Sequence, residues 1–370
     1  MRITLLSLLL LLAFALAGAA ENQAFLGIFA ETSVQKMVGM PDMSAMMGNL
    51  PPGMVLPGMP QRNLTVRLWS PSIAPKDAFA RLAVPAGLKQ GKQLNLDLYR
   101  PTEVKGKGGN ADTGMPDPEQ VKDFTIIRYW GSSPTVKPGQ PEIIKFAAMA
   151  AADKETVRDQ ARRTQSEYYY KPDWTTGYWP TAKQPGKITA DVVLAGRYDL
   201  TTNYTGNVGI DVPETVRFLN PIEFASPNLA QQIDFSKPMV FKWKPIPGVL
   251  GYHAAIFAMK GKNTLITWNS SEIKGFESVS TDYMQMSDVL KYVKSTAMMA
   301  GDRIEVIVPA GIFNDCDMVM FTMIGYGTGA ALAEGQPLPR VQTKTTVSIM
   351  LGGKGMAEMD MGNMGDEDEE

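Results

Sequence analysis

The stretch MVFKWKPIPGVLGYHAAIFAMKGKNTLITWNSS, residues Met239–Ser271, alternates short apolar runs with turn-forming residues. It predicts a strand, a Pro-Gly turn, a second strand, a glycine turn and a third strand, because Pro and Gly interrupt regular structure. Upstream, Asn63–Ser70 and Leu94–Tyr99 alternate apolar and polar residues with the period of a half-buried strand. Many short strands separated by turns predict an all-β fold of the sandwich type.

The chain has 370 residues, a length that usually divides into two domains. We predict two β-sandwich domains of immunoglobulin-like type, residues 62–212 and 213–352. Residues 21–61 precede them as a linker rich in Met, Pro and Gly, and residues 353–370 follow as a disordered tail rich in Met and acidic residues. One or two short helices are expected, at Met286–Met299 and in the later part of Ala147–Thr164.

Residues 1–20 have the pattern of a secretory signal peptide, with Arg2, an apolar run and small residues that predict cleavage near Ala20. The apolar run is shorter than the roughly 20 residues that span a bilayer, and no later run is long enough. We therefore expect a periplasmic or secreted protein without a transmembrane segment after cleavage. The single cysteine, Cys316, predicts stabilisation by the core rather than by an internal disulfide, which favours a bacterial chain.

Charge and the scarcity of histidine narrow the function classes. The 36 Lys and Arg residues nearly balance the 38 Asp and Glu residues, so no nucleic-acid partner is expected. His253 is the only histidine, and its apolar strand context favours a structural role over that of a general base. Cys316 lies between two aspartates, which disfavour a reactive thiolate. We expect no catalytic activity.

The pattern F-x-W-x-P-x-P-G-x-x-G-Y, Phe241–Tyr252, resembles the region between strands B and C of a fibronectin type III or related immunoglobulin-like domain. In that family an inward Trp lies in strand B, and a Tyr opens strand C after a Pro-rich turn; Trp243 and Tyr252 are the matching positions here. The resemblance covers roughly Thr215 to Gly352 and implies an architecture, not a shared chemistry.

Aromatic residues are concentrated in YYYKPDWTTGYWP, Tyr168–Pro180. Pro172, Gly177 and Pro180 predict turns, which would place three of the rings on loops or strand ends, where rings can stack on sugars. The candidate ligand-binding residues are therefore Trp174, Tyr178 and Trp179, with Tyr129 and Trp130 joining them. The alternative is that these rings fill a core or a domain interface.

Methionine is unusually frequent before and after the predicted domains. Met37, Met40, Met43 and Met46 recur at three-residue spacing, with Met47 beside them, and the tail adds Met356, Met359, Met361 and Met364. Thioethers suit Cu(I). The pattern resembles the methionine-rich segments of periplasmic copper-handling proteins, although those usually include His and these do not. The alternative is a loosely packed, oxidisable segment.

The sequence thus favours an exported, non-catalytic binding or structural protein of the bacterial envelope or extracellular space, with no cofactor. An envelope polymer, such as a glycan bound through the aromatic loops, or an envelope protein is the expected partner. A periplasmic Cu(I)-handling protein is the alternative, with copper bound by Met37, Met40, Met43, Met46 and Met47.

Overall fold

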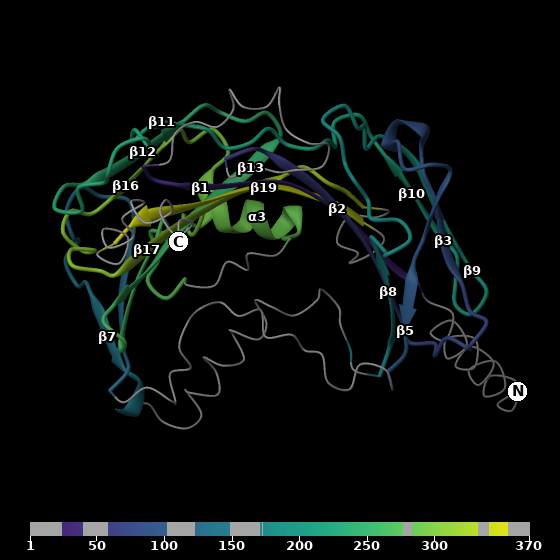
Figure 1. Cartoon of the computed structure of the whole chain (residues 1–370), viewed down its shortest axis with the longest axis horizontal. Coiled ribbons are helices and arrows are strands. Elements are labelled where there is room, and N and C mark those ends of the chain that lie inside the picture. Colours follow the sequence, from purple (N-terminus) through teal and green to yellow (C-terminus); the bar gives the residue numbers. More distant parts are fainter. Residues whose placement is uncertain are drawn as a thin grey trace, which may run out of the picture.

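The computed structural model of the chain describes residues 24–39, 58–101, 123–148, 171, 173–276, 283–331 and 340–353. Figure 1 shows these residues as an arch, in which one long curved sheet runs from leg to leg and a smaller sheet covers the outside of each half. The predicted all-β sandwich architecture is confirmed. Among the described residues, none of the helices has the length and apolar character needed to span a membrane.

The long sheet has 12 strands, ten of them in the order β5-β8-β2-β1-β19-β17-β13-β14-β6-β7. The short strands β15 and β18 pair with β13 and β19. The strands are β5 (Asp97–Tyr99), β8 (Thr175–Trp179), β2 (Gln61–Ser70), β1 (Phe25–Met37), β19 (Arg340–Gly352), β17 (Met318–Gly327), β13 (Val249–Lys260), β14 (Thr264–Asn269), β6 (Thr125–Trp130), β7 (Glu142–Lys145), β15 (Met299–Ala300) and β18 (Ala330–Ala331).

Two smaller sheets complete the sandwiches. One has the order β10-β9-β3-β4 and the other β11-β12-β16. Their strands are β10 (Val208–Val212), β9 (Gly196–Thr202), β3 (Ala80–Ala83), β4 (Gln93–Asn95), β11 (Phe224–Ser226), β12 (Met239–Trp243) and β16 (Glu305–Val308). The described helices are α3 (Met286–Lys294) and the 3-10 turns η2 (Ala86–Leu88) and η3 (Phe146–Ala148).

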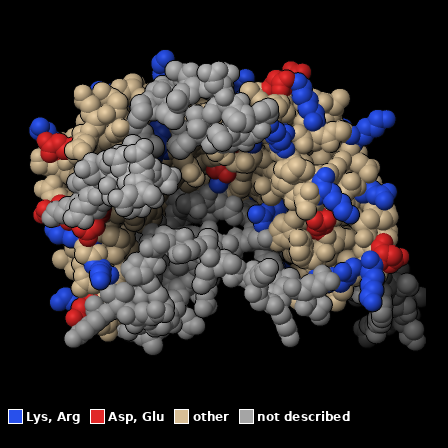
Figure 2. Space-filling view, viewed as in Figure 1, with Lys and Arg blue, Asp and Glu red and all other residues tan. Residues whose placement is uncertain are grey.

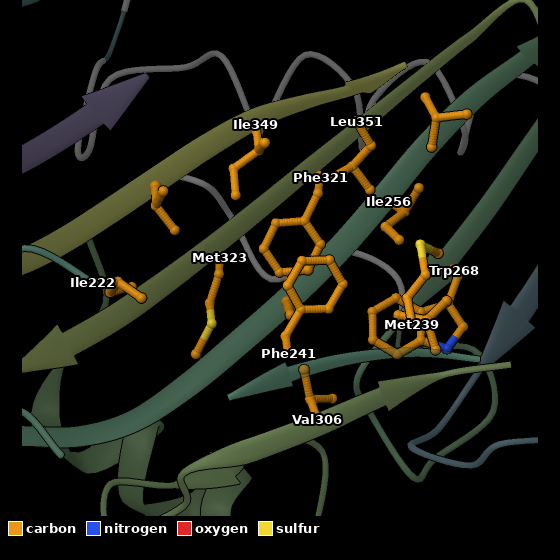
Figure 3. Close-up of a cluster of buried hydrophobic side chains, with 14 of the residues drawn as sticks. Ile222, Met239, Phe241, Ile256, Trp268, Val306, Phe321, Met323, Ile349 and Leu351 are labelled. Atoms are coloured by element: carbon orange, nitrogen blue, oxygen red, sulfur yellow. The ribbon is translucent and has the colours of Figure 1, made fainter. Parts of the chain in front are cut away.

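Each half of the long sheet packs on its smaller sheet through a separate core. The first core joins β1, β2 and β8 to the four-stranded sheet and includes Leu26, Ile28, Val66, Leu82, Trp179 and Tyr198. The second joins β13, β17 and β19 to the three-stranded sheet, and Figure 3 shows Phe241 and Phe321 at its centre. These two rings stack with their centroids 4.2 Å apart.

The second sandwich begins at Phe224 and includes strands of the long sheet. From Phe224 onward the strands divide into β11-β12-β16 and β14-β13-β17-β19. Trp243 and Tyr252, the two matching residues, are both buried with ring centroids 5.4 Å apart. The helix α3 lies between the fourth and fifth of these strands.

The linker prediction is corrected at Phe25–Met37, which forms the 13-residue strand β1. Within this stretch Leu26, Ile28 and Ala30 alternate toward the first core, and β1 pairs with β2 and β19. The long sheet also contains strands from both predicted domains, since β6 and β7 extend it beyond β14. The pairing of strands therefore crosses the predicted boundary between residues 212 and 213.

The structure tests the predicted helices in part. The helix predicted at Met286–Met299 is shorter than expected, because α3 begins at Met286 but ends at Lys294, and Met299 lies in β15. The second predicted helix, in the later part of Ala147–Thr164, lies outside the described residues, as do the signal peptide and the tail after Gly353.

Candidate functional site

The face of the long sheet that is turned toward the inside of the arch is the candidate binding surface, and we call it the inner face (Figure 1). Side chains alternate between the two faces of a strand. Leu26, Ile28 and Ala30 of β1 lie in the core, so Phe25 and Phe29 belong to the inner face. Figure 2 shows positive and negative side chains interspersed over the described surface in the same view.

At one end of the inner face, aromatic residues from four strands meet. The register aligns Phe25 of β1, Trp69 of β2, Thr176 of β8 and Tyr99 of β5 in one row across the sheet. The adjacent row consists of Gly27, Arg67, Tyr178 and Asp97. We call these two rows, together with Trp174 and Lys171, the aromatic end.

Four rings of the aromatic end form two contacting pairs, and each pair has a cation beside it. Trp174 stacks on Phe25 with centroids 5.3 Å apart and planes at 22°, and Lys171 Nζ lies 4.4 Å from the Trp174 ring centroid. Tyr99 and Tyr178 meet edge to face at 5.3 Å and 74°. The Arg67 guanidinium lies 5.3 Å from the Tyr178 ring centroid. Tyr99 is 44% exposed, and Trp174 and Tyr178 are half-buried.

Of the predicted ligand-binding residues, Trp174 and Tyr178 lie at the aromatic end, but Trp179 does not. Trp179 is the neighbour of Tyr178 in β8 and therefore points to the opposite face, where it is 1% exposed in the first core. It cannot stack on a ligand. Gly177, which suggested a turn, lies inside β8, where an added Cβ would be 3.1 Å from Leu98 Cδ2.

Tyr129 and Trp130 do not join this cluster. They lie on β6, which six strands separate from β8 in the long sheet. Tyr129 packs against the second core, and its burial raises the pKa of its hydroxyl. Trp130 is half-buried and is in register with Asn269, with Lys274 Nζ 5.9 Å from its ring centroid. Tyr168–Tyr170 lie outside the described residues.

The centre of the inner face is covered by α3. Val289 and Val293 pack against Gly251 of β13, where an added Cβ would lie 2.7 Å from Val293 Cγ2. His253 is 5% exposed in this region, with its ring centroid 6.3 Å from that of Phe276. Burial lowers the pKa of His253 to about 4. A buried imidazole with this pKa fits the structural role expected from the sequence better than that of a general base near neutral pH.

Between α3 and the aromatic end, a row of buried and half-buried polar residues lies on the inner face. Lys344 Nζ lies 3.5 Å from Glu31 Oε1, which also accepts a 2.7 Å hydrogen bond from Thr346 Oγ1. The same ammonium lies 4.5 Å from the ring centroid of Tyr283. Gln342 Nε2 donates to the Met284 carbonyl oxygen at 2.7 Å. These contacts join the segment before α3 to β19.

The predicted methionine site falls only partly within the described residues. Met37 ends β1 and is 39% exposed, whereas Met40, Met43, Met46 and Met47 lie outside the described residues. Within the described part of the chain, no three His, Cys, Asp or Glu residues cluster as metal ligands. Cys316 is buried in the second core at 3% exposure, as expected of a structural thiol.

In comparisons with known proteins, the sequence matches no protein-family model and no curated protein.

Sequence reasoning missed Phe25, Arg67 and Tyr99 as members of the aromatic end. Phe25 falls in the predicted linker, although the alternation of Leu26, Ile28 and Ala30 is itself a strand signal. Arg67 and Tyr99 fall in predicted strands, but nothing in one sequence shows that β5, β8, β2 and β1 are neighbours. Their proximity depends on pairings between segments far apart in the chain.

Proposed function

We propose that the protein is an exported, non-catalytic binding protein whose aromatic end binds an extended polymer, with a glycan as the first candidate. The single observation that supports this function most strongly is the edge-to-face pair of the partly exposed rings Tyr99 and Tyr178, on strands that neighbour each other at one end of the inner face. Rings with a polar tip suit a wet, half-apolar binding surface.

The placement of these residues favours an extended polymer as the ligand over a single flat molecule. Tyr99 and Tyr178 lie on neighbouring strands, so their backbone positions are held by the sheet. Because their planes are at 74°, a ligand can stack on one ring and contact the edge of the other. Arg67 and Asp97, in the same row as Tyr178, provide hydrogen-bonding groups for hydroxyls beside the rings.

Export is part of the proposal and rests on the sequence pattern of residues 1–20. A periplasmic or secreted location would bring the inner face into contact with envelope or extracellular polymers. An envelope protein is the other partner class, and an extended segment of such a protein could use the same rings.

Affinity electrophoresis in gels containing hydroxyethyl cellulose, xylan or soluble starch tests the glycan proposal. We expect at least one polymer to retard the protein, and the double variant Tyr99→Ala/Tyr178→Ala to migrate as in a polymer-free gel. The matched control is Trp130→Ala, which removes a half-buried ring of the inner face that six intervening strands separate from Tyr178. Equal retardation of the double variant and the wild type would contradict the proposal, as would the absence of retardation in all three gels.

Periplasmic handling of Cu(I) is the second candidate function. One observation favours it: Met37, the first methionine of the three-residue repeat, ends β1 in an exposed position rather than in a core. Thioether sulfur is a soft ligand that suits Cu(I). Methionine-to-leucine substitutions are the suitable test of this candidate. A deletion of residues 21–60 would also remove β1 from the middle of the long sheet.

A further inference from the structure

Three methionines from three adjacent central strands of the long sheet lie side by side near the ends of these strands. Met37 of β1 is in register with Met350 of β19, and Met350 is in register with Met320 of β17. We call these three residues the methionine row. Met320 and Met350 belong to the C-terminal half of the chain, and the sequence pattern around Met37 did not point to them.

All three side chains belong to the inner face. Phe321, Ile349 and Leu351 point into the second core in Figure 3, and each is next in sequence to a methionine of the row. Because neighbouring residues of a strand point to opposite faces, Met320 and Met350 point away from that core. Met37 is 39% exposed, and Met320 and Met350 are half-buried. Solvent and a dissolved ion therefore have access to the methionine row.

The spacing suits a metal ion bound by three thioethers. Neighbouring strands lie about 4.8 Å apart, so the outer two Cα atoms of the row are separated by about 10 Å. The methionine side chain is unbranched and has three rotatable bonds, which lets the outer two sulfur atoms turn toward the central one. Sulfur ligands without charge select soft, monovalent ions such as Cu(I) over Zn²⁺ or Ca²⁺, which prefer harder or anionic ligands.

The direction of the strands adds a second observation. β1 and β19 are parallel, with Met37 opposite Met350, so both strands end on the same side of the sheet. The two methionine-rich stretches of the sequence follow these two strand ends. The methionine row itself consists only of described residues, but the chain supplies further methionines after both strands.

We infer that the methionine row is a binding site for Cu(I), with the thioether sulfurs of Met37, Met320 and Met350 as its ligands. The site does not depend on the polymer-binding function proposed for the aromatic end. It gives the copper-handling alternative a set of ligands on a folded sheet instead of in the methionine-rich stretch alone.

Titration of the purified, reduced protein with Cu(I) against a chromophoric Cu(I) chelator tests the site under anaerobic conditions. We expect the wild type to bind Cu(I), and the double variant Met320→Leu/Met350→Leu to bind it at least about 100-fold more weakly, because loss of an outer-shell partner alone costs about 10–100-fold in metal affinity. Leu for Met conserves volume, so unfolding curves of both proteins should nearly coincide.

Two further variants make the result specific. Met284→Leu/Met286→Leu removes two thioethers at the start of α3 and should bind Cu(I) as the wild type does. Met40→Leu/Met43→Leu/Met46→Leu/Met47→Leu leaves the methionine row intact and should retain the site. The inference is overturned if the wild type binds no Cu(I), if Met320→Leu/Met350→Leu binds as the wild type does, or if only the fourfold variant loses binding. Affinity electrophoresis of the same variants shows whether polysaccharide binding remains when Cu(I) binding is lost. Failure of this inference is thereby distinguished from failure of the polymer proposal.

Discussion

The aromatic end and the methionine row are two ends of the same inner face, and β1 connects them. Phe25 begins this strand and Met37 ends it, 13 residues in all, or about 40 Å at about 3.3 Å per residue. The backbone offers the same pleated surface at both ends. At one end four strands place rings and cations on it, and at the other three strands place thioethers on it.

This difference shows that the chemistry of each end depends on which strands are neighbours, not on the local sequence of one strand. In β1 itself, the inner-face positions change from Phe25 and Phe29 through Glu31 to Met37. Each of these side chains acquires its partners through strands that are distant in the chain, such as Trp69 for Phe25, Lys344 for Glu31 and Met350 for Met37. The covered centre, with α3 and His253, separates the two ends.

The largest effect is expected from Trp179→Ala, because the ring is fully buried in the first core. Removal of a buried Trp side chain typically lowers the free energy of unfolding by about 3–5 kcal/mol. Tyr178→Ala, one residue away on the inner face, should lower it by only about 1 kcal/mol but should weaken polymer binding. Urea unfolding and affinity electrophoresis measure the two effects. Equal loss of stability in both variants would show that the assignment of faces in β8 is wrong.

A smaller effect is expected from acid acting on the covered centre of the inner face. The pKa of His253 is lowered from 6.5 to about 4 by burial, so the unfolded chain takes up its proton more readily than the folded chain does. The contribution of His253 to the free energy of unfolding should therefore fall as the pH falls below 6.5. The total loss down to pH 4 should be about 3 kcal/mol.

The comparison of urea unfolding curves at pH 8 and pH 4 for the wild type and His253→Gln isolates this contribution. Since Gln does not titrate, the variant should lose about 3 kcal/mol less than the wild type over this range. The same pH dependence in both proteins would mean that His253 is not held neutral under α3.

The smallest of these effects concerns the polar row between the covered centre and the aromatic end. Lys344→Met leaves the Glu31 carboxylate, whose side chain is 21% exposed, without the ammonium 3.5 Å away. We expect a loss of about 1–3 kcal/mol in the free energy of unfolding. Because the two charges interact, Glu31→Gln/Lys344→Met should cost less than the sum of the single changes. Strict additivity in this cycle would contradict a direct interaction between the Glu31 and Lys344 side chains.

The sequence predicted the fold class well because strand alternation and turn residues are local signals. The strands around Trp243 and Tyr252 and the start of the helix at Met286 followed from such signals. The pairing of β1 with β19 did not, since these strands join residues more than 300 positions apart, and alternation shows only which side chains share a face. The linker prediction for Phe25–Met37 is wrong because, apart from Gly27, the Met, Pro and Gly that characterise the segment begin only at Met37.

The candidate sites were predictable only in part for the same reason. Trp174 and Tyr178 are recognisable by composition, but Trp179 is misplaced because Gly177 and Pro180 suggest a turn in which all rings could be exposed. Met37 is recognisable by its spacing from later methionines. Met320 lies in a methionine-rich strand, between Met318 and Met323, but only the register of β1, β19 and β17 brings Met320 and Met350 to Met37.

Titration with Cu(I) of two variants, Met320→Leu/Met350→Leu and Tyr99→Ala/Tyr178→Ala, tests most directly whether the two ends of the inner face are distinct sites. We predict that the aromatic-end variant binds Cu(I) as tightly as the wild type and that the methionine-row variant does not. Equal Cu(I) affinity of the two variants, whether both retain it or both lose it, would contradict the assignment of a separate site to each end.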